Sequence, residues 1–583
     1  MFKLAFKNLN KLLVSFAFFC LFFQVAADLI LPSITADIVN IGVVRKNIPY
    51  IWHTGLIMLA VSLLGIIGAV CNQLIAATSS QKLGVKLRHF LFAKITAMAT
   101  ADFTKIGEAS LITRTTNDVV QMQNVTYSML RMMVRAPMML AGASLMAYFQ
   151  SPQLMLVFVA AIPILAIVVL LIMRKSVPLF RKIQGLTDRI NLVFREGLTG
   201  VRVIRAFNQD AFEQRRFARA NGNLTDNAIN AYVTTSLMSP TMTFIISASN
   251  IAIVWFGAHL IAGSQMPIGN LLSFITYATQ MLFAFMQLSM IFVIVPRAQA
   301  SAQRIQEVLA ISDTILDSNN AQTVPNITSI RFAHVDFAFS HSAARVLKDI
   351  NLQVGRGQTL AIIGGTGSGK SSLINLIPRL FDPTKGSVSI NDIDIRQFRQ
   401  SDLHEKIAFA SQKSFLFQGT IRSNLHYGNP KASEEEMWQA LHTAQADAFV
   451  KKQGGLDAPV EQNGQNFSGG QVQRLSIARA ILKDADVYIF DDTFSALDFK
   501  TDALLRAALH KDSKINRAIK IIVAQRISTI ADADRILLLE QGRISAFGTH
   551  TELLKTSTVY REIVNSQLHR VDAAAALSGD EHA

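Results

Sequence analysis

Residues 364–371 combine glycines, a lysine and a serine at a spacing that suits phosphate binding. They read Gly-Gly-Thr-Gly-Ser-Gly-Lys-Ser and match the pattern G-x-x-x-x-G-K-[ST]. An apolar run, 359–363, precedes them, and a helix-like stretch, 372–380, follows. In a strand–loop–helix of this kind, successive backbone N–H groups and the helix N-terminus face the phosphates. The sequence therefore predicts that this chain binds a nucleoside triphosphate.

The side chains of this loop are expected to serve both phosphate and metal. Lys370 can bridge the phosphates, and the Ser371 hydroxyl can complete a Mg²⁺ shell. A chance glycine-rich turn with an incidental lysine would lack the flanking strand and helix. The expected nucleotide contacts from the loop are Gly364, Gly365, Thr366, Gly367, Ser368, Gly369, Lys370, Ser371 and Ser372.

Further stretches of the second half carry groups that a nucleotide site needs. Asp491 and Asp492 end an apolar strand, where carboxylates can serve a Mg²⁺ ion and a water molecule beside the phosphates. Gln412 follows another apolar strand, and Asp498 follows the paired carboxylates. A serine with exposed backbone N–H groups opens a predicted helix and offers a second phosphate-binding surface. Its residues are Ser468, Gly469, Gly470 and Gln471.

The composition of the first half indicates a membrane protein. The chain is 50% hydrophobic and 17% charged, with a net charge of +15. Residues 1–300 hold 25 Lys and Arg against 10 Asp and Glu, whereas residues 301–583 hold 31 of each. The positive charge lies between apolar spans, which is typical of membrane topology rather than of nucleic-acid binding. No nucleic-acid partner is therefore expected.

Six apolar stretches are long enough, or nearly so, to cross about 30 Å of hydrocarbon. The short connections 151–152 and 263–270 carry no charge, whereas the long connections 76–132 and 174–241 are rich in Lys and Arg. The positive-inside rule then places both termini and the long connections in the cytoplasm. We expect a multi-pass protein of the cytoplasmic (inner) cell membrane, in contact with membrane lipid. The expected spans are 11–32, 51–75, 133–150, 153–173, 242–262 and 271–295.

The start of the chain also resembles a cleavable signal peptide, with a basic end, an apolar stretch and small residues at 25–27. Cleavage would leave an odd number of crossings. An intracellular nucleotide domain requires an even number here, so we interpret residues 11–32 as a retained span.

These patterns predict an α-helical membrane domain with six transmembrane helices extended into the cytosol, fused to an α/β P-loop ATPase domain. The long basic connections are expected to be helices that continue beyond the membrane. The expected divisions are a transmembrane domain at 1–300, a linker at 301–325 with its hinge at Asp313–Pro325, a nucleotide-binding domain at 326–567 and a disordered tail at 568–583.

On these motifs the sequence resembles the ABC transporters, specifically bacterial half-exporters of the multidrug type. Gln412 with the following Phe415–Ile421 looks like the family's Q-loop, and Phe467–Gln471 looks like its signature with Phe for the usual Leu. Phe339 stands where an aromatic ring would stack on adenine. The resemblance implies that two nucleotide domains close head to tail. Each ATP, with Mg²⁺ held by Ser371, Gln412 and Asp491, would lie between one chain's phosphate loop and the other's signature.

Two departures from the family pattern concern catalysis. Asp492 stands where the family has Glu, and Gln525 stands where it has a histidine. A general base misplaced by about 1 Å can cost around a hundredfold in rate, and Gln cannot carry a positive charge as His can. We therefore expect a degenerate site that binds ATP and turns it over slowly. A heterodimer with a second ABC half-exporter is favoured, and a homodimer with two slow sites is the alternative.

The substrate is less defined by the sequence. Residues such as Met281 and Phe283 suit a promiscuous apolar cavity, and they are equally ordinary in lipid contact and helix packing. Gln24 and Asp28 are polar within the first span, and an intramembrane carboxylate is a functional candidate that can attract cationic compounds. We expect ATP-driven export of hydrophobic or amphipathic, drug-like small molecules. A lipid or lipid-precursor flippase and a non-transporting sensor that uses ATP as a switch remain the alternatives.

Overall fold

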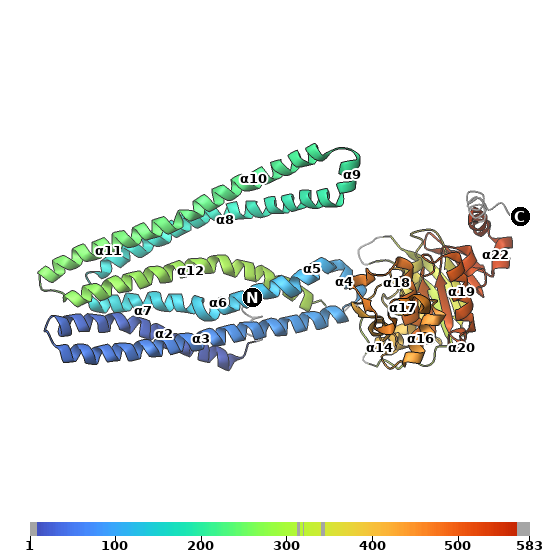
Figure 1. Ribbon diagram of the computed structural model, residues 1–583, viewed down its shortest axis with the longest axis horizontal. Helices are drawn as coiled ribbons and strands as arrows, with labels where there is room; N and C mark the ends of the chain where they lie inside the picture. Colours follow the sequence, from blue (N-terminus) through green and yellow to red (C-terminus); the bar gives the residue numbers. More distant parts are fainter. Residues whose placement is uncertain (1–8, 312–314, 319, 340–343, 568–583) are drawn as a thin grey trace. The chain divides into compact units, whose positions relative to one another are not determined.

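The computed structural model of the chain describes residues 9–311, 315–318, 320–339 and 344–567, without the side chains of residues 289, 290, 292 and 293. The chain forms two compact units (Figure 1). The helical unit contains Met1–Thr96 and Glu108–Ile311, and the α/β unit contains Ala97–Gly107 and Ser312–Ala583. Asp313 of the expected hinge and the expected tail 568–583 lie outside the described residues.

The helical unit is built from long apolar helices joined by short turns. Among the described residues, six helical stretches are long and apolar enough to cross a membrane, as the sequence predicts. The helices run on without interruption into the long basic connections; α3, for example, has 50 residues. The elements are α2 (Lys11–Asp37), η1 (Ile38–Val43), α3 (Ile48–Ala97), α5 (Glu108–Thr113), η2 (Arg114–Asp118), α6 (Val119–Ser128), η3 (Met129–Met133), α7 (Val134–Gln150), α8 (Met155–Thr199), α9 (Val201–Ala206), α10 (Asp210–Ser236), α11 (Met238–Ala262) and α12 (Ile268–Leu309).

Apolar packing and a few buried polar bonds hold these helices together. Phe158 of α8 stacks on Phe274 of α12, with ring centroids 4.8 Å apart. The side-chain amide of Asn72 is buried and donates to backbone carbonyls of α2 and η3. At the end of α12, Arg304 forms an ion pair with the buried carboxylate of Asp118, at 2.5 Å. Figure 1 shows α8 and α10 side by side as a long hairpin.

The α/β unit contains a six-stranded sheet in the order β12-β11-β3-β10-β9-β6, in which only β12 is antiparallel to its neighbour. A four-stranded antiparallel sheet, β2-β1-β4-β5, and a small pair, β7-β8, complete it. The strands are β1 (Ser329–Phe337), β2 (Leu347–Gly355), β3 (Thr359–Ile363), β4 (Lys385–Ile390), β5 (Ile393–Asp394), β6 (Ile407–Ala410), β7 (Gly419–Thr420), β8 (Pro459–Val460), β9 (Val487–Asp491), β10 (Ile519–Val523), β11 (Arg535–Glu540) and β12 (Arg543–Gly548).

Alternate residues of each parallel strand enter two separate cores. In β3, Leu360 and Ile362 pack in the core shared with the antiparallel sheet and α13, whereas Ala361 and Ile363 face the core under the other helices. Parallel strands covered on both faces are apolar throughout, as the strand runs of the sequence are. The helices are α4 (Thr100–Ile106), α13 (Lys370–Asn375), η4 (Ile395–Gln397), α14 (Gln400–Glu405), α15 (Ile421–Leu425), α16 (Glu434–Thr443), α17 (Asp447–Lys452), η5 (Gly455–Asp457), η6 (Gln462–Gly464), α18 (Gly469–Leu482), α19 (Phe499–Lys511), α20 (Ser513–Arg517), α21 (Ile527–Ile530) and α22 (His550–Thr556).

Two element boundaries differ from the sequence-based expectation. The helix expected at 372–380 is α13, which begins at Lys370 and ends at Asn375. Pro378 lacks an N–H group and cannot continue the helical bonds, so the chain turns before it. In the other unit, α12 reaches Leu309, which lies inside the range expected for the linker, 301–325.

Candidate functional site

The phosphate-type loop joins the carboxyl end of β3 to the first turn of α13. A Cβ atom on Gly364 would collide with the carbonyl oxygen of Leu539. Gly369 has a φ of +104°, a left-handed conformation that disfavours any other residue. These two glycines let the loop curl tightly and place Lys370 at the first position of the helix.

Lys370 and Ser371 make their contacts within the loop and with β9. The Lys370 ammonium group donates to the carbonyl oxygens of Gly364 and Gly365, both at 2.8 Å. The Ser371 hydroxyl donates to the Asp491 carboxylate at 3.4 Å. Burial lowers the pKa of Lys370, and the carboxylates of Asp492 and Asp491 oppose that shift. An anionic phosphate would replace the two carbonyls as a stronger partner for this cation.

Asp492 is held by two glutamines from different loops. It follows β9 with a φ of +50°, and its side chain is buried. Its Oδ2 atom accepts hydrogen bonds from Gln525 Nε2 at 2.7 Å and from Gln412 Nε2 at 3.2 Å. Because β6, β9 and β10 are parallel neighbours, their carboxyl ends bring these three residues to one edge of the sheet.

Asp491, the last residue of β9, lies at the same edge and is also buried. Burial raises the pKa of the Asp491 carboxyl group, and the hydrogen bond from Ser371 opposes the shift. The Ser371 hydroxyl and the Asp491 carboxylate present two hard oxygen ligands at a separation close to the roughly 3 Å between neighbouring ligands of one Mg²⁺ ion. With the amide oxygen of Gln412, this donor set fits Mg²⁺, which would neutralise phosphate charge there.

Phe339 is positioned beside the loop with an accessible ring. It makes edge contacts with Phe337 and Phe381, with ring centroids 5.0 and 5.5 Å apart, and its side chain is 43% exposed. Edge contacts leave a ring face free to stack on a planar base.

The structure brings most of the predicted residues around one pocket of about 380 Å³. Gly364, Gly365 and Ser368 belong to the loop but do not line it, and the Ser468 and Asp498 stretches do not line it either. Its lining is Phe339, Val346, Thr366, Gly367, Gly369, Lys370, Ser371, Ser372, Gln412, Asp491, Asp492, Val523 and Gln525.

The Ser468 stretch forms a separate, exposed helix start. Ser468 caps α18 by accepting a hydrogen bond from Gln471 N, and Gln471 Oε1 accepts one in return from Ser468 N at 2.9 Å. Gly469 has open space where a Cβ would stand, and Gly470 lies close to the Ala496 carbonyl. Asp498 caps α19 through Thr501. The capping bonds thus occupy the N–H groups of Ser468 and Gln471, and this exposed helix start does not line the pocket of Lys370.

Two residues that the sequence interpretation missed fasten the Gln525 loop. Gln567 donates to the carbonyl oxygen of Gln525 and accepts from Ile527 N, both at 2.8 Å. Arg526 donates to the carbonyl oxygens of Leu497 at 3.0 Å and Ser495 at 3.1 Å. Arg526 directly follows Gln525, so its place in the sequence could have indicated its role. Gln567 lies far from Gln525 along the chain, and no local pattern indicates that it reaches this loop.

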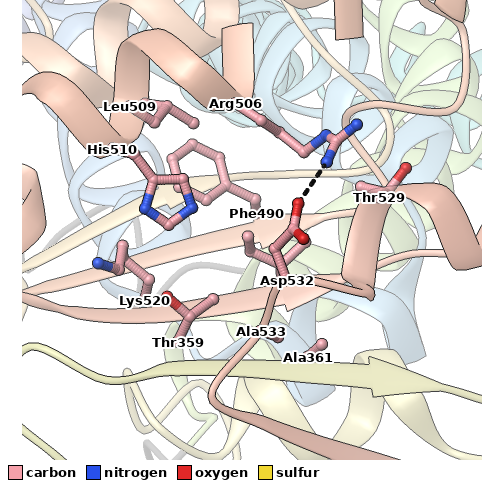
Figure 2. A pocket seen from close by; sticks show the side chains of 11 residues that line it. Thr359, Ala361, Phe490, Arg506, Leu509, His510, Lys520, Thr529, Asp532 and Ala533 are labelled. Atoms are coloured by element: carbon pink, nitrogen blue, oxygen red, sulfur yellow. Dashed lines mark hydrogen bonds and ion pairs between the residues drawn. The ribbon is translucent and has the colours of Figure 1, made fainter. Parts of the chain in front are cut away.

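A second cavity lies under α19 and is much smaller (Figure 2). Its volume of about 30 Å³ accommodates about two water molecules, not a substrate. Arg506 beside it contacts Asp532 at 3.4 Å and Asp502 at 3.5 Å, an ion-pair arrangement that ties α19 to the segment after α21. We therefore assign this cavity a structural role.

Comparisons with known proteins agree with this architecture. Residues 14–285 match the family "ABC transporter transmembrane region", and residues 347–495 match the family "ABC transporter". An uncharacterised ABC transporter ATP-binding protein of Mycobacterium tuberculosis is 39% identical over 546 residues, 93% of each chain. The ATP-dependent lipid A-core flippase of Chromohalobacter salexigens is 32% identical over 473 residues, 81% of each chain. A solved bacterial Atm1-family ABC exporter with ATP bound shares the fold, with a TM-score of 0.78 at 22% identity over 95% of this chain and 98% of that one.

Proposed function

This chain belongs to the ABC transporter family, and from that premise we propose that it is the degenerate-site half of a heterodimeric exporter of hydrophobic or amphipathic compounds. ABC exporters hydrolyse ATP to drive transport, and they work as dimers. The proposal adds an asymmetry between the two ATP sites. It places the protein in the cytoplasmic membrane with both termini in the cytosol, because the Lys- and Arg-rich connections favour that orientation.

The observation that carries the proposal is the pairing of Asp492. Both hydrogen bonds to its Oδ2 atom come from glutamine amides, Gln525 and Gln412. A general base must accept a hydrogen bond, and then the proton, from the attacking water. This oxygen instead accepts hydrogen bonds from two amide N–H groups, which occupy the acceptor positions that the water would need. Aspartate is also one methylene shorter than glutamate, which places the carboxylate farther from the attacking water.

The partner is proposed to be a second, different half-exporter. The exposed start of α18 at Ser468 would face the partner's ATP, while Lys370, Ser371, Asp491, Gln412 and Phe339 would hold ATP and Mg²⁺ in this chain's own site. The competent site would then contain the partner's loop and this chain's Ser468. A homodimer would contain two copies of Asp492 and Gln525 and no competent site.

ATPase assays on the chain purified alone test the proposal. If the missing glutamate contributes a hundred- to thousandfold, about 3–4 kcal/mol of barrier, hydrolysis should lie near background. The double substitution Asp492→Glu with Gln525→His should raise turnover at least tenfold. Strong hydrolysis by the unmodified chain, with no second protein detectable by mass spectrometry, would overturn the heterodimer.

A lipid flippase is a second candidate because two relatives, at 32% and 30% identity, are named ATP-dependent lipid A-core flippases. ATP-dependent uptake of a fluorescent amphipathic dye into inside-out vesicles supports export of drug-like compounds. ATPase stimulation that depends on the lipid headgroup, without dye uptake, would favour the flippase. Transport of neither the dye nor a lipid would favour the non-transporting role.

A further inference from the structure

A cluster of polar side chains lies within the apolar spans, where α2, α7 and α12 meet. Arg135 Nη2 of α7 forms an ion pair with Asp28 Oδ2 of α2 at 3.0 Å. Gln280 Nε2 of α12 donates to the backbone carbonyl of Asp28, also at 3.0 Å. The sequence analysis named Asp28 as a functional candidate that can attract cationic compounds. The structure adds a partner that the sequence did not predict, because the Asp28 carboxylate is paired with an arginine.

A missing helical donor explains the hydrogen bond of the Gln280 amide nitrogen but not the burial of its amide oxygen. Pro32 lies four residues after Asp28 and has no N–H group, so the Asp28 carbonyl loses its usual helical donor. The Gln280 amide nitrogen supplies that donor, as neighbouring helices do for proline-opened turns in membranes. The amide oxygen of Gln280, however, is buried and has no hydrogen-bond partner among the described residues.

Arg135 shows the same incomplete pairing. Its Nη2 atom binds Asp28, but its Nε atom is buried without a partner in the described part of the chain. The cluster therefore presents one unused donor and one unused acceptor close to a net-neutral ion pair. Buried polar groups are usually fully bonded, so an unused pair of opposite kind points to a polar ligand.

The cluster lies well away from the ends of its helices. Asp28 stands fifteen residues before the end of η1 and Arg135 fifteen residues before the end of α7, about 20 Å along each helix. The same helix ends meet through Asn270, which bonds Asn40 and the carbonyl of Gln150. A hydrocarbon core is about 30 Å thick, so with these helix ends at its surface the charges would lie inside it.

The exposed part of the ion pair indicates where a ligand would approach. The Asp28 and Arg135 side chains each remain 31% exposed. Charged groups at this depth face a protein interior or an aqueous pathway and not lipid. Buried apolar residues lie beside them, including Val25, Met139 and Met281, and methionine adapts readily to different apolar shapes.

We propose that Arg135, Asp28 and Gln280 form the headgroup subsite for a zwitterionic amphiphile. An anionic oxygen of the headgroup binds the Arg135 guanidinium, and an ammonium group binds Asp28 and the Gln280 amide oxygen. A zwitterion matches because the protein pair is neutral, whereas a headgroup with net charge would leave excess charge in a low-dielectric region. This inference rests on the proposed export of amphipathic compounds and names its substrate class.

Proteoliposomes containing the full transporter, this chain with its partner, test the subsite. The probes are fluorescent phosphatidylethanolamine, phosphatidylglycerol and diacylglycerol with the same label, and ATP-dependent translocation of each is measured. Replacing both partners, Arg135→Leu with Asp28→Leu, avoids leaving one unpaired charge. The quantity compared is the translocation rate of phosphatidylethanolamine divided by that of diacylglycerol. We expect this ratio to fall at least tenfold in the double variant and about threefold or more in Gln280→Leu.

Ser33→Ala is the matched control, because Ser33 bonds Tyr277 about one helical turn away and takes no part in the subsite. Its ratio should stay at the wild-type value. An unchanged ratio in both the double variant and Gln280→Leu would overturn the subsite, as would a wild type that moves only the uncharged or anionic probe. A wild type that moves none of the probes would instead overturn the export of amphiphiles itself.

Discussion

The Lys370 pocket and the exposed start of α18 handle polar groups in opposite ways. In the pocket, the polar side chains have partners within the site: Lys370 donates to backbone carbonyls of its own loop, and Asp492 accepts from two glutamine side chains. At Ser468, the capping bonds stay within one helical turn, and Gly469 leaves open space beside the backbone. One region thus closes on itself, and the other is open to an external ligand.

This difference indicates that ATP binding and ATP hydrolysis can depend to different degrees on the residues of this chain. The two departures that concern catalysis, Asp492 and Gln525, both fall in the closed region, whereas the open region departs at Phe467, which stands for the usual Leu. The serine and glycines of the open region follow the pattern. If the two regions serve different ATP molecules, substitutions in them should have unequal effects on the assembled transporter.

The largest effect is expected at the open region. Ser468→Ala with Gly469→Asp should lower the ATPase rate of the assembled transporter by a hundredfold or more, because a carboxylate would repel the partner's phosphates. Ser433→Ala is the control, since Ser433 caps α16 with the same bond pattern. Losing that cap should cost about 1 kcal/mol of stability with little change in rate. A near-normal rate in the Ser468 variant would remove α18 from the catalytic interface.

A large effect is also expected on nucleotide binding in the closed region. Lys370→Ala should weaken ATP binding at this chain's site by about a hundredfold, because the phosphates lose their main side-chain cation. Photo-crosslinking of a labelled ATP analogue, followed by mass spectrometry of this chain, measures it. Lys385→Ala, at an exposed lysine of β4, is the control. Full affinity in the Lys370 variant would refute the phosphate-loop assignment.

A small effect is expected from Asp492. Asp492→Asn should lower the ATPase rate of the assembled transporter less than threefold, because the proposed degenerate site would contribute little to turnover. Steady-state hydrolysis by the assembled transporter measures this rate. A loss as severe as that of the Ser468 variant would mean that Asp492 is a working base and that the two regions do not differ as proposed.

The smallest effect is expected from Gln567, which fastens the Gln525 loop from outside the pocket. Gln567→Ala removes two hydrogen bonds at 2.8 Å, so the unfolding free energy should fall by about 1–2 kcal/mol. ATP affinity should change less than twofold. Denaturant unfolding with parallel nucleotide titration separates the two quantities, and a tenfold loss of affinity would place Gln567 in the binding machinery.

The sequence predicts the parts of the fold that local patterns encode. Six apolar spans and the strand before Gly364 are visible in one stretch of chain each, and the structure contains them. The roles of Lys370 and Asp492 remain predictions. The pairing of Asp28 with Arg135 was not predictable, because 107 residues separate them and neither helix shows a pattern for the other. Tertiary packing decides such partners, as it also decides that Gln567 reaches Gln525.

Helix α3 differs mechanically from its neighbours. Its 50 residues make a rod of about 75 Å, and no proline interrupts it beyond its first turn. By contrast, α2, α8 and α12 contain Pro32, Pro163 and Pro296, each a point where a helix bends more easily. In a rod of this length a tilt of about 5° displaces the far end by about 6–7 Å. Helix α3 can therefore act as a lever that carries small rotations over a long distance.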